Sequence, residues 1–279
     1  MSPASPFDDP VPRGYRVVLA TLRIAVAVQC WGAAASWFTL EDSGGVLGAL
    51  TNAGGWPEPT ARLIMNRIAW GLLACGTFTL VRPCWPVLIG VTAWFGFVAA
   101  LGPLQDTSRL QPAAHAARYL APLALLLLDW WPPVVKFSLG RAGVGLFFLR
   151  LGAAATFAGH GLQALRQSRE GGHFVELITG SMEHVFHWDV STDHAQLALG
   201  VIGGMDIGLA IGLMLVRSRP IACWMGVWGI LTAVSRVLAL GPEAYPMVLI
   251  RFAHGGAPFT LFLYWYLAVK EQPAITVPK

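Results

Sequence analysis

Residues Leu149 to Leu165 have the sequence LRLGAAATFAGHGLQAL, an apolar helix with an arginine near one end and Gly159-His160-Gly161 near the other. A similar stretch, LRIAVAVQCWGAAAS, occupies Leu22 to Ser36, 127 positions earlier, with the same Leu-Arg opening and many small residues. Two copies of an apolar helix of this length predict a duplicated membrane unit.

The composition of the whole chain is that of a membrane protein. Of its 279 residues 55% are hydrophobic and only 12% are charged, which is too apolar for one soluble core. Segments near the roughly 20 residues needed to cross the hydrocarbon layer predict an all-α fold with eight transmembrane helices. These segments are Tyr15–Phe38, Arg62–Val81, Cys84–Gly102, Ala114–Trp131, Gly143–Leu165, His194–Val216, Arg219–Leu240 and Met247–Val269.

The eight segments fall into two groups of four. We expect a tail at 1–14, a first four-helix unit at 15–131, a linker at 132–142, a second unit at 143–269 and a tail at 270–279. The N-terminal residues contain acids and prolines before any apolar run, which is typical of a short tail and not of a signal peptide. The four cysteines form no Cys-x-x-Cys pair, so we expect buried, inert thiols.

Ordered coincidences support a duplication. The second predicted span ends in VRP and the sixth in VRSRP, and Leu101-Gly102-Pro103 recurs as Leu240-Gly241-Pro242. Arg118-Tyr119 in the fourth span has a counterpart in Arg251-Phe252 of the eighth. Because each unit has an even number of spans, the two copies must share one orientation in the membrane.

Charges between the predicted spans indicate the orientation. Basic residues gather on the side of both termini, among them Arg16, Arg82, Lys136 and Arg217, whereas the opposite loops are rich in Asp and Glu. By the positive-inside rule, both termini are cytoplasmic in a multi-pass protein of the bacterial inner membrane. A net charge of +4 distributed in this way does not imply nucleic acid as a partner.

The sixth span carries glycines at a spacing of four. Gly200, Gly204, Gly208 and Gly212 would share one helix face and let a neighbouring backbone approach closely. We interpret this face as a device for helix packing, not as a cofactor site.

The two units differ most in their polar residues, and the second has ionisable groups inside its predicted spans. They are Arg150, His160, Asp206, Arg236, Arg251 and His254. Counted from the outer span ends, His160 and His254 lie about 8 and 10 Å deep, and Arg236 and Arg251 share their layer. A charged group in a span costs at least roughly 2.5 kcal/mol, so each needs a partner, a cavity or the headgroups.

Three interpretations of this layer are open. The arginines could extend to the headgroups while the histidines bond to neighbouring helices. Alternatively, Arg236 and Arg251 bind an anion or a quinone head group, and His160 and His254 exchange protons or donate hydrogen bonds. The third interpretation is a haem b held by His160 and His254.

Asp206 stands apart from this layer. It lies about 18 Å from the outer end of its span, near the bilayer centre. There it is either protonated or paired with a cation, and a proton-relay role and a structural hydrogen bond are equally compatible with its position.

The outer loop of the second unit, 166–193, contains further potential ligands. His184, His187, Asp189 and His194 are of the types that bind zinc or copper, but their spacing is no recognised signature. The simpler interpretation is an interfacial helix whose Phe174, Val185, Phe186 and Trp188 pack onto the membrane. The chain has no Gly-x-Ser-x-Gly elbow and no phosphate-binding loop, which argues against hydrolytic or nucleotide chemistry.

Two stretches resemble the DoxX/DoxD-like integral membrane family. Phe148 to Leu165 resembles its first helix, and Gly203 to Pro220, GGMDIGLAIGLMLVRSRP, resembles its second. Arg150, His160, Gly161 and Asp206 occupy the motif positions, with Asp where the family usually has Glu. In the first unit Ala33 replaces the histidine and Ala69 the acid, so this unit is expected to serve mainly as a scaffold.

The resemblance implies four-helix membrane units, here fused in tandem. The best-described member type is the membrane subunit of thiosulfate:quinone oxidoreductase, which implies quinone-linked electron transfer and the oxidation of a small sulfur oxyanion. We therefore expect an oxidoreductase subunit in which His160 and Asp206 handle protons, with other membrane or periplasmic subunits as partners. The competing hypothesis is a non-enzymatic membrane carrier or an assembly subunit of a larger complex.

Overall fold

The computed structural model describes residues 13–104, 109–129 and 139–270, and every regular element there is a helix. The first half contains α1 (Arg13–Leu40), α2 (Val46–Gly48), the π-helical η1 (Ala49–Ala53), α3 (Glu58–Val81), α4 (Trp85–Leu104), α5 (Gln111–Ala114) and α6 (Ala116–Leu128). The second half contains α7 (Leu139–Glu170), α8 (His173–Phe186), α9 (Thr192–Leu215), α10 (Arg219–Leu240), the 3-10 helix η2 (Pro242–Ala244), α11 (Tyr245–Ile250) and α12 (Phe252–Lys270).

Six helices in the described ranges are long and apolar enough to cross a membrane: α1, α3, α4, α7, α9 and α10. A seventh crossing results if Pro242–Ile250 and Phe252–Leu267, which meet at an angle of 48°, are one broken span. The prediction of eight full-length spans is not confirmed. The predicted span Ala114–Trp131 is interrupted at His115, and α6 has 13 residues, about 20 Å, which is short of the roughly 30 Å hydrocarbon core.

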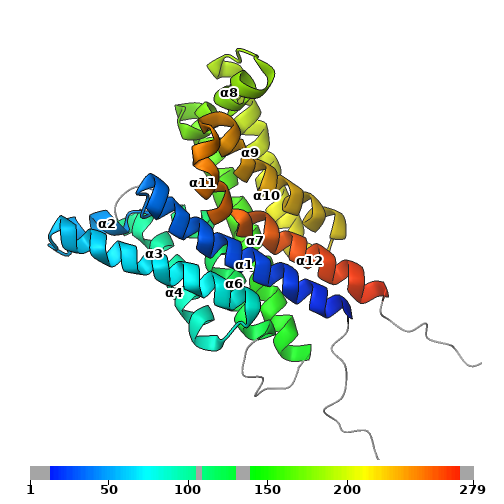
Figure 1. The fold of residues 1–279 in the computed structure, drawn as a ribbon. Coiled ribbons are helices and arrows are strands. Elements are labelled where there is room, and N and C mark those ends of the chain that lie inside the picture. The colour runs from blue at the N-terminus through cyan, green and yellow to red at the C-terminus, as the bar shows by residue number, and fades with distance from the viewer. Residues whose placement is uncertain (1–12, 105–108, 130–138, 271–279) are drawn as a thin grey trace, which may run out of the picture.

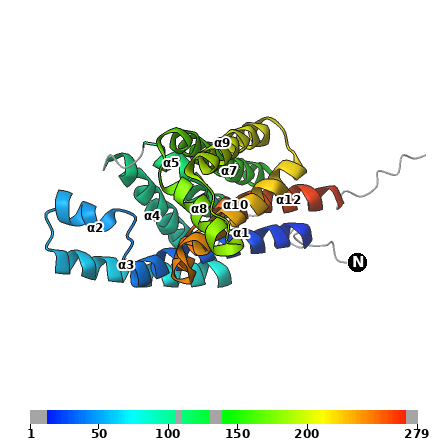
Figure 2. The ribbon, with the colours of Figure 1, turned by 90° about the horizontal axis from the view of Figure 1, so that it is seen from above.

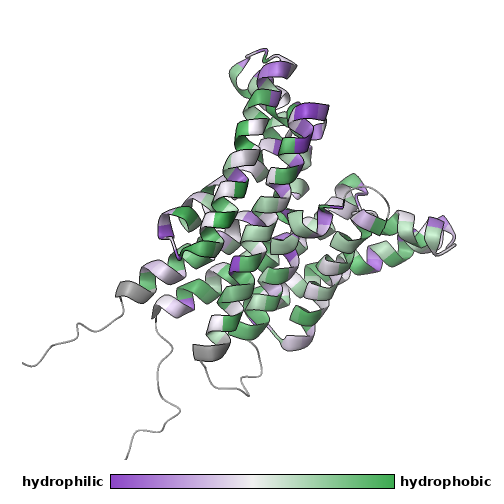
Figure 3. Cartoon of the chain, turned by 180° about the vertical axis from the view of Figure 1, so that it is seen from behind, coloured by the Kyte–Doolittle hydropathy of each residue, from purple (hydrophilic) through white to green (hydrophobic). Residues whose placement is uncertain are grey.

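The outer surfaces of the long helices suit contact with lipid. Large apolar side chains are exposed there, including Trp70 and Phe78 on α3, Leu197 on α9, and Trp224 and Leu231 on α10. Figure 3 shows hydrophobic residues along the lengths of the helices and hydrophilic ones mainly at their ends. Apolar surface of this extent is uncommon on soluble proteins, so these helices suggest a multi-pass membrane protein.

Four helices from both halves form the centre of the molecule. α1 packs against α12, and α7 packs against α6, so each half supplies two central helices. Outside them, α1 pairs with α3 and α6 with α4, as α7 pairs with α9 and α12 with α10. In Figure 1 and Figure 2, α3 and α4 therefore lie on one side of the centre and α9 and α10 on the other.

Close helix contacts depend on glycines at matching places in α1 and α7. A Cβ added to Gly159 would overlap the backbone of Ala114 in α5, and one added to Gly32 would overlap the backbone of Ile250 in α11. α7 therefore touches the last residue of α5, and α1 touches the last residue of α11. These contacts bring both helix breaks into the centre of the molecule.

The glycine face predicted for the sixth span is wrong at its two central positions. A Cβ at Gly204 or Gly208 would meet nothing, and both residues are exposed. The close approach of α9 to α7 instead uses Gly203, whose added Cβ would lie 2.8 Å from the carbonyl oxygen of Gly161. Seen without its neighbours, the spacing of four could not show which glycines face a partner helix.

The start of α1 and the end of α12 lie at the same end of the bundle (Figure 1). Most of the predicted tails, 1–14 and 270–279, and of the linker, 132–142, lies outside the described residues. Lys136, one of the basic residues used to orient the chain, is among them.

Candidate functional site

Two helix breaks position the polar residues of the candidate site. α5 gives way to α6 at His115, and α11 gives way to α12 at Arg251, and neither residue has regular helical dihedral angles. One turn later each new helix carries a second basic side chain, Arg118 in α6 and His254 in α12. The first break thus has the sequence HAAR (115–118) and the second has RFAH (251–254).

The surrounding residues give both breaks the same register. Ala117, Ala121, Pro122 and Leu125 recur 136 positions later as Ala253, Ala257, Pro258 and Leu261. The prediction that Arg118 corresponds to Arg251 is therefore wrong by three residues, because Arg118 corresponds to His254 and His115 to Arg251. The local similarity of Arg118-Tyr119 to Arg251-Phe252 hid this register.

Six basic side chains meet where the two breaks come together. We call them the His/Arg cluster: His115, Arg118, His160, Arg236, Arg251 and His254. The ring centroids of His160 and His254 are 5.2 Å apart, and that of His115 lies 6.3 Å from His160 and 6.2 Å from His254. Arg118 donates a hydrogen bond from Nε to Nε2 of His254 at 3.3 Å, which requires that nitrogen of His254 to be unprotonated.

The arginines of the cluster form no ion pair with another described residue. Arg118 and Arg236 are 5% and 6% exposed, and the ion pairs in the described part of the chain include neither of them, nor Arg251. Arg236 and Arg251 each donate one Nη1 hydrogen bond to a carbonyl of their own helix turn, at 2.6 and 3.0 Å. Arg118 Nη2, Arg236 Nε and Arg251 Nε are buried without a hydrogen-bond acceptor in the described residues.

This arrangement favours an anion or a strong acceptor at the cluster. Burying a charge is costly unless it is paired, and a buried donor without an acceptor adds a penalty of about 1–3 kcal/mol. Guanidinium groups have fixed, forked donors that suit carboxylate, sulfate or carbonyl oxygens. A ligand that supplies such oxygens would remove both penalties at once.

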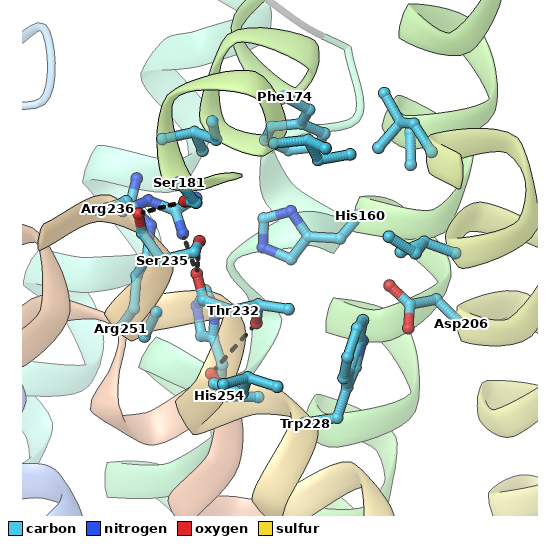
Figure 4. Close-up of a pocket in the computed structure, with 18 of the residues that line it drawn as sticks. His160, Phe174, Ser181, Asp206, Trp228, Thr232, Ser235, Arg236, Arg251 and His254 are labelled. Carbon is cyan, nitrogen blue, oxygen red and sulfur yellow. Dashed lines mark hydrogen bonds between the residues drawn. The ribbon is translucent and has the colours of Figure 1, made fainter. Parts of the chain in front are cut away.

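A pocket of about 310 Å³ opens beside the cluster within the second half of the chain. We call it the large pocket. Its walls are mainly apolar side chains of α7, α8, α9 and α10, and its polar lining residues include His160, Asp206, Arg236, Arg251 and His254. Figure 4 shows Arg236 and Arg251 on one side of this space, Asp206 and Trp228 on the other, and His160 between them. Apolar walls with a few convergent polar groups are typical of sites for small organic ligands.

Asp206 shares the large pocket but does not pair with the arginines. It is 7% exposed, and its Oδ1 has no hydrogen-bond partner in the described residues. The nearby indole N–H of Trp228 is buried and interacts with the Asp206 carboxyl group. Of the two states predicted for Asp206, pairing with a cation is not found among the described ion pairs. The Asp206 carboxyl group and the arginines of the cluster lie on opposite sides of the pocket (Figure 4).

Helix α8 covers the large pocket. Phe174, Leu177, Ile178, Ser181 and Met182 line it, and Ser181 donates a hydrogen bond to the carbonyl of Ser235 in α10 at 3.2 Å. At the start of α8, burial and then the charge of Arg236 lower the pKa of His173. The predicted interfacial helix is thus a pocket cover, although Val185, Phe186 and Trp188 at its far end remain exposed.

The outer-loop residues considered as metal ligands are not brought together. No group of three or more His, Cys, Asp or Glu in the described ranges is arranged to hold a metal ion. His184 and His187 are exposed, and His194 interacts with Ser191 at 2.8 Å. Asp189, also exposed, belongs to the segment between α8 and α9.

Arg150 lies outside the site, against the expectation from its motif position. Its Nε and Nη2 donate to the carbonyls of Leu213 and Met214, at 2.5 and 2.8 Å, at the end of α9. Cations satisfy the free carbonyls at a helix C-terminus well. At the matching position of α1, Arg23 pairs with Asp129 after the end of α6, so both arginines fasten helix ends.

The first half supplies two members of the cluster that sequence analysis missed, His115 and Arg118. The expectation that this half serves mainly as a scaffold did not include these two residues. Arg118 extends to His254 in the other half, and the carbonyl of Arg118 accepts a hydrogen bond from Gln29 at 2.9 Å. The available signal was the pair of four-residue patterns at the breaks, HAAR and RFAH.

Two of the three interpretations of the polar layer do not fit this geometry. Arg236 is buried within the protein, so it does not extend to the headgroups. A haem between His160 and His254 would need a macrocycle and two iron–nitrogen bonds between their rings, and a centroid separation of 5.2 Å leaves too little space. The remaining interpretation is a pocket for an anion or a quinone head group.

No family model matches this chain, and no curated protein and no solved structure is similar to it.

Proposed function

We propose that this chain is an inner-membrane protein of two DoxX-like four-helix units, with both termini in the cytoplasm. We further propose that the large pocket binds a quinone head group and that the chain serves as a membrane subunit of quinone-linked electron transfer. The observation that carries this proposal is the set of three arginines, without ion pairs, beside an apolar pocket of about 310 Å³. This volume lies at the lower end of the usual range for organic ligands.

The side chains of the pocket divide the work between them. Arg236 and Arg251 would donate to a carbonyl oxygen of the ring and stabilise negative charge there, as pre-organised donors do in a site that excludes water. His160 and Asp206 face the same space and can hold or release a proton. The quinone itself would supply the electron-accepting chemistry.

Several observations support the two-unit architecture. Helices pair in the same order in both halves, the helix breaks share one register, and Gly32 and Gly159 make corresponding contacts. The described ends of the chain lie at one end of the bundle, as expected for units of even crossing number. This would require the short helices α5 and α6 to complete a crossing together.

Quinone binding by the purified protein tests the proposed function. Titration of decylubiquinone into protein in mild detergent should give saturable binding that Arg236→Gln weakens about tenfold or more, since one hydrogen bond to a charged group contributes about 1.5–3 kcal/mol. Arg219→Gln, an exposed position at the start of the same helix, is the matched control and should bind as the wild type does. Equal binding by Arg236→Gln and the wild type would remove the large pocket from this role.

Turnover in membranes tests the proton-handling roles. With thiosulfate as the electron donor, His160→Ala and Asp206→Asn should abolish quinone reduction while leaving the protein folded. The exposed residues His184 and Asp193 provide controls as His184→Ala and Asp193→Asn. Unchanged turnover in the first pair would contradict the assignment. A purified protein that contains and binds no quinone would instead favour the carrier or assembly subunit.

A further inference from the structure

A second pocket, of about 190 Å³, lies on the other side of the His/Arg cluster, within the first half. We call it the small pocket. Its walls come from α1, α3, α4 and α5, from the loop after α1, and from Arg118 and Arg251. Arg251 lines both pockets, and Arg118 of the small pocket is hydrogen-bonded to His254 of the large one. The cluster is therefore a wall shared by the two pockets.

The two pockets occupy matching positions but are lined by different side chains. The buried positions of α3 and α4 recur 134 residues later in α9 and α10, so the counterpart of Asp206 is Leu72 and not the predicted Ala69. Ala33, Leu72 and Trp94 line the small pocket, and their counterparts His160, Asp206 and Trp228 line the large one. The small pocket thus keeps the tryptophan but has neither a histidine nor a buried acid at the other two matching positions. Its buried polar groups are guanidinium and imidazole groups of the cluster.

Some of these groups have no acceptor. Nη2 of Arg118, Nδ1 of His115 and Nε of Arg251 are buried without a hydrogen-bond partner in the described residues, and Arg118 is only 5% exposed. All three residues line the small pocket. An oxyanion with several equivalent oxygens could accept from more than one of them, which a single carbonyl group could not do.

One exposed carboxylate lies at the small pocket. Asp42 lines it from the loop after α1, interacts electrostatically with Arg118 and Arg251, and forms no ion pair with either. Its Oδ1 accepts a hydrogen bond from the backbone N–H of Gly44 at 2.9 Å, which fixes it in the loop. Because Asp42, Ser43 and Gly44 are loop residues, this pocket is lined partly by polar surface chain, unlike the apolar walls of the large pocket.

We propose that the small pocket binds a small, water-soluble oxyanion through Arg118 and Arg251, at the same time as a lipophilic ligand occupies the large pocket. The proposal deepens the proposed function and rests on it only for the identity of the second ligand. The smaller volume, the absence of a buried acid among the lining residues and the unpaired donors all favour a compact anion over a quinone ring with its tail. The shared wall would hold the two ligands on opposite sides of His115 and His254.

Binding of sulfate and thiosulfate to the purified protein tests this inference. Isothermal titration in detergent, at constant ionic strength set with a chloride salt, should give saturable binding to the wild type. Arg118→Gln should weaken it about tenfold or more because a charged donor is removed. Ala33→Leu fills the small pocket without changing charge and should also abolish binding, which separates loss of the site from any effect of the buried arginine on folding.

Asp42→Asn provides a readout that a structural role would not give. Removing this exposed negative charge should strengthen anion binding about two- to fivefold, and higher salt should reduce the gain, since the interaction is screened. Arg236→Gln should leave anion binding within about twofold of the wild type, because Arg236 does not line the small pocket. The quinone titration of the same variants then separates the two sites.

The outcomes distinguish the failure of each proposal. Anion binding that persists in Ala33→Leu and is unaffected by Asp42→Asn would overturn the small-pocket site, whatever the quinone result. A wild-type protein that binds the anion but not quinone would overturn the proposed function and leave the anion site standing. Phospholipid phosphate that copurifies with the wild type and is lost in Arg118→Gln, without binding of free sulfate, would assign the small pocket to a lipid headgroup and contradict a soluble oxyanion.

Discussion

The large pocket and the small pocket occupy matching places in the two halves, and they differ where chemistry would differ. Each pocket has a tryptophan at the matching position, Trp228 or Trp94, whereas His160 and Asp206 of the large pocket correspond to Ala33 and Leu72 of the small one. The breaks carry the same two residue types in opposite order, HAAR and RFAH. One helical framework can therefore be kept while its two cavities acquire different ligands, because the glycine contacts fix the framework and the lining residues do not.

The largest effect is expected at those glycine contacts. Gly159→Ala and Gly32→Ala each place a methyl group onto the backbone of the other half, so both should sharply reduce the yield of folded, monodisperse protein. Gly204→Ala, where an added Cβ meets nothing, should be neutral or slightly stabilising. Size-exclusion profiles in detergent and thermal unfolding would measure this. A large loss in only one of the two glycine variants would break the equivalence of the halves.

A conversion of the small pocket sharpens the comparison. The variant Leu72→Asp gives the small pocket the acid of the large one. The added carboxylate should repel an oxyanion close to Arg118 and weaken sulfate binding about tenfold or more. Isothermal titration against the wild type measures the change, with Leu72→Asn as the uncharged control of the same size. Undiminished sulfate binding in Leu72→Asp would show that this position does not set the ligand.

A smaller effect on the free energy of unfolding should distinguish Arg236 from Arg150, because replacing each by methionine is expected to act in opposite directions. Arg236 has no ion pair in the described residues, so Arg236→Met should leave the ligand-free protein as stable as the wild type or stabilise it by about 1–2 kcal/mol. Arg150 satisfies two helix-end carbonyls, so Arg150→Met should cost about 1 kcal/mol. Thermal unfolding of both proteins after ligand removal decides this. Equal destabilisation would mean that Arg236 is a structural residue.

Sequence analysis predicted much of the fold because the long apolar segments have only one favourable arrangement in lipid. Seven of the eight predicted segments correspond to long helices or to the bent α11–α12 pair. The remaining segment, Ala114–Trp131, was predicted as a full span because an apolar run does not reveal a helix break. α6 begins only after the break at His115 and ends at Leu128, and hydrophobicity alone predicts neither boundary.

The site was predicted only in part, for a similar physical reason. Depth along a helix can be counted from the sequence, and the four residues counted to one layer, His160, Arg236, Arg251 and His254, line one pocket. The direction of a side chain depends on which helices lie beside it. The sequence therefore could not predict that Arg118 points into the cluster or that Arg150 points away from it. A family motif indicated Arg150, but the carbonyls of Leu213 and Met214 account for that position without any ligand.

Cross-linking with a photoreactive quinone analogue in native membranes tests most directly whether the unpaired arginines serve a bound ligand. Labelled peptides should map to the lining of the large pocket, around Phe174 in α8 and Trp228 in α10, and the labelling should be competed by excess decylubiquinone and lost in Arg236→Gln. Labelling confined to lipid-facing positions such as Trp70 and Leu197, without competition and unchanged in Arg236→Gln, would contradict the account.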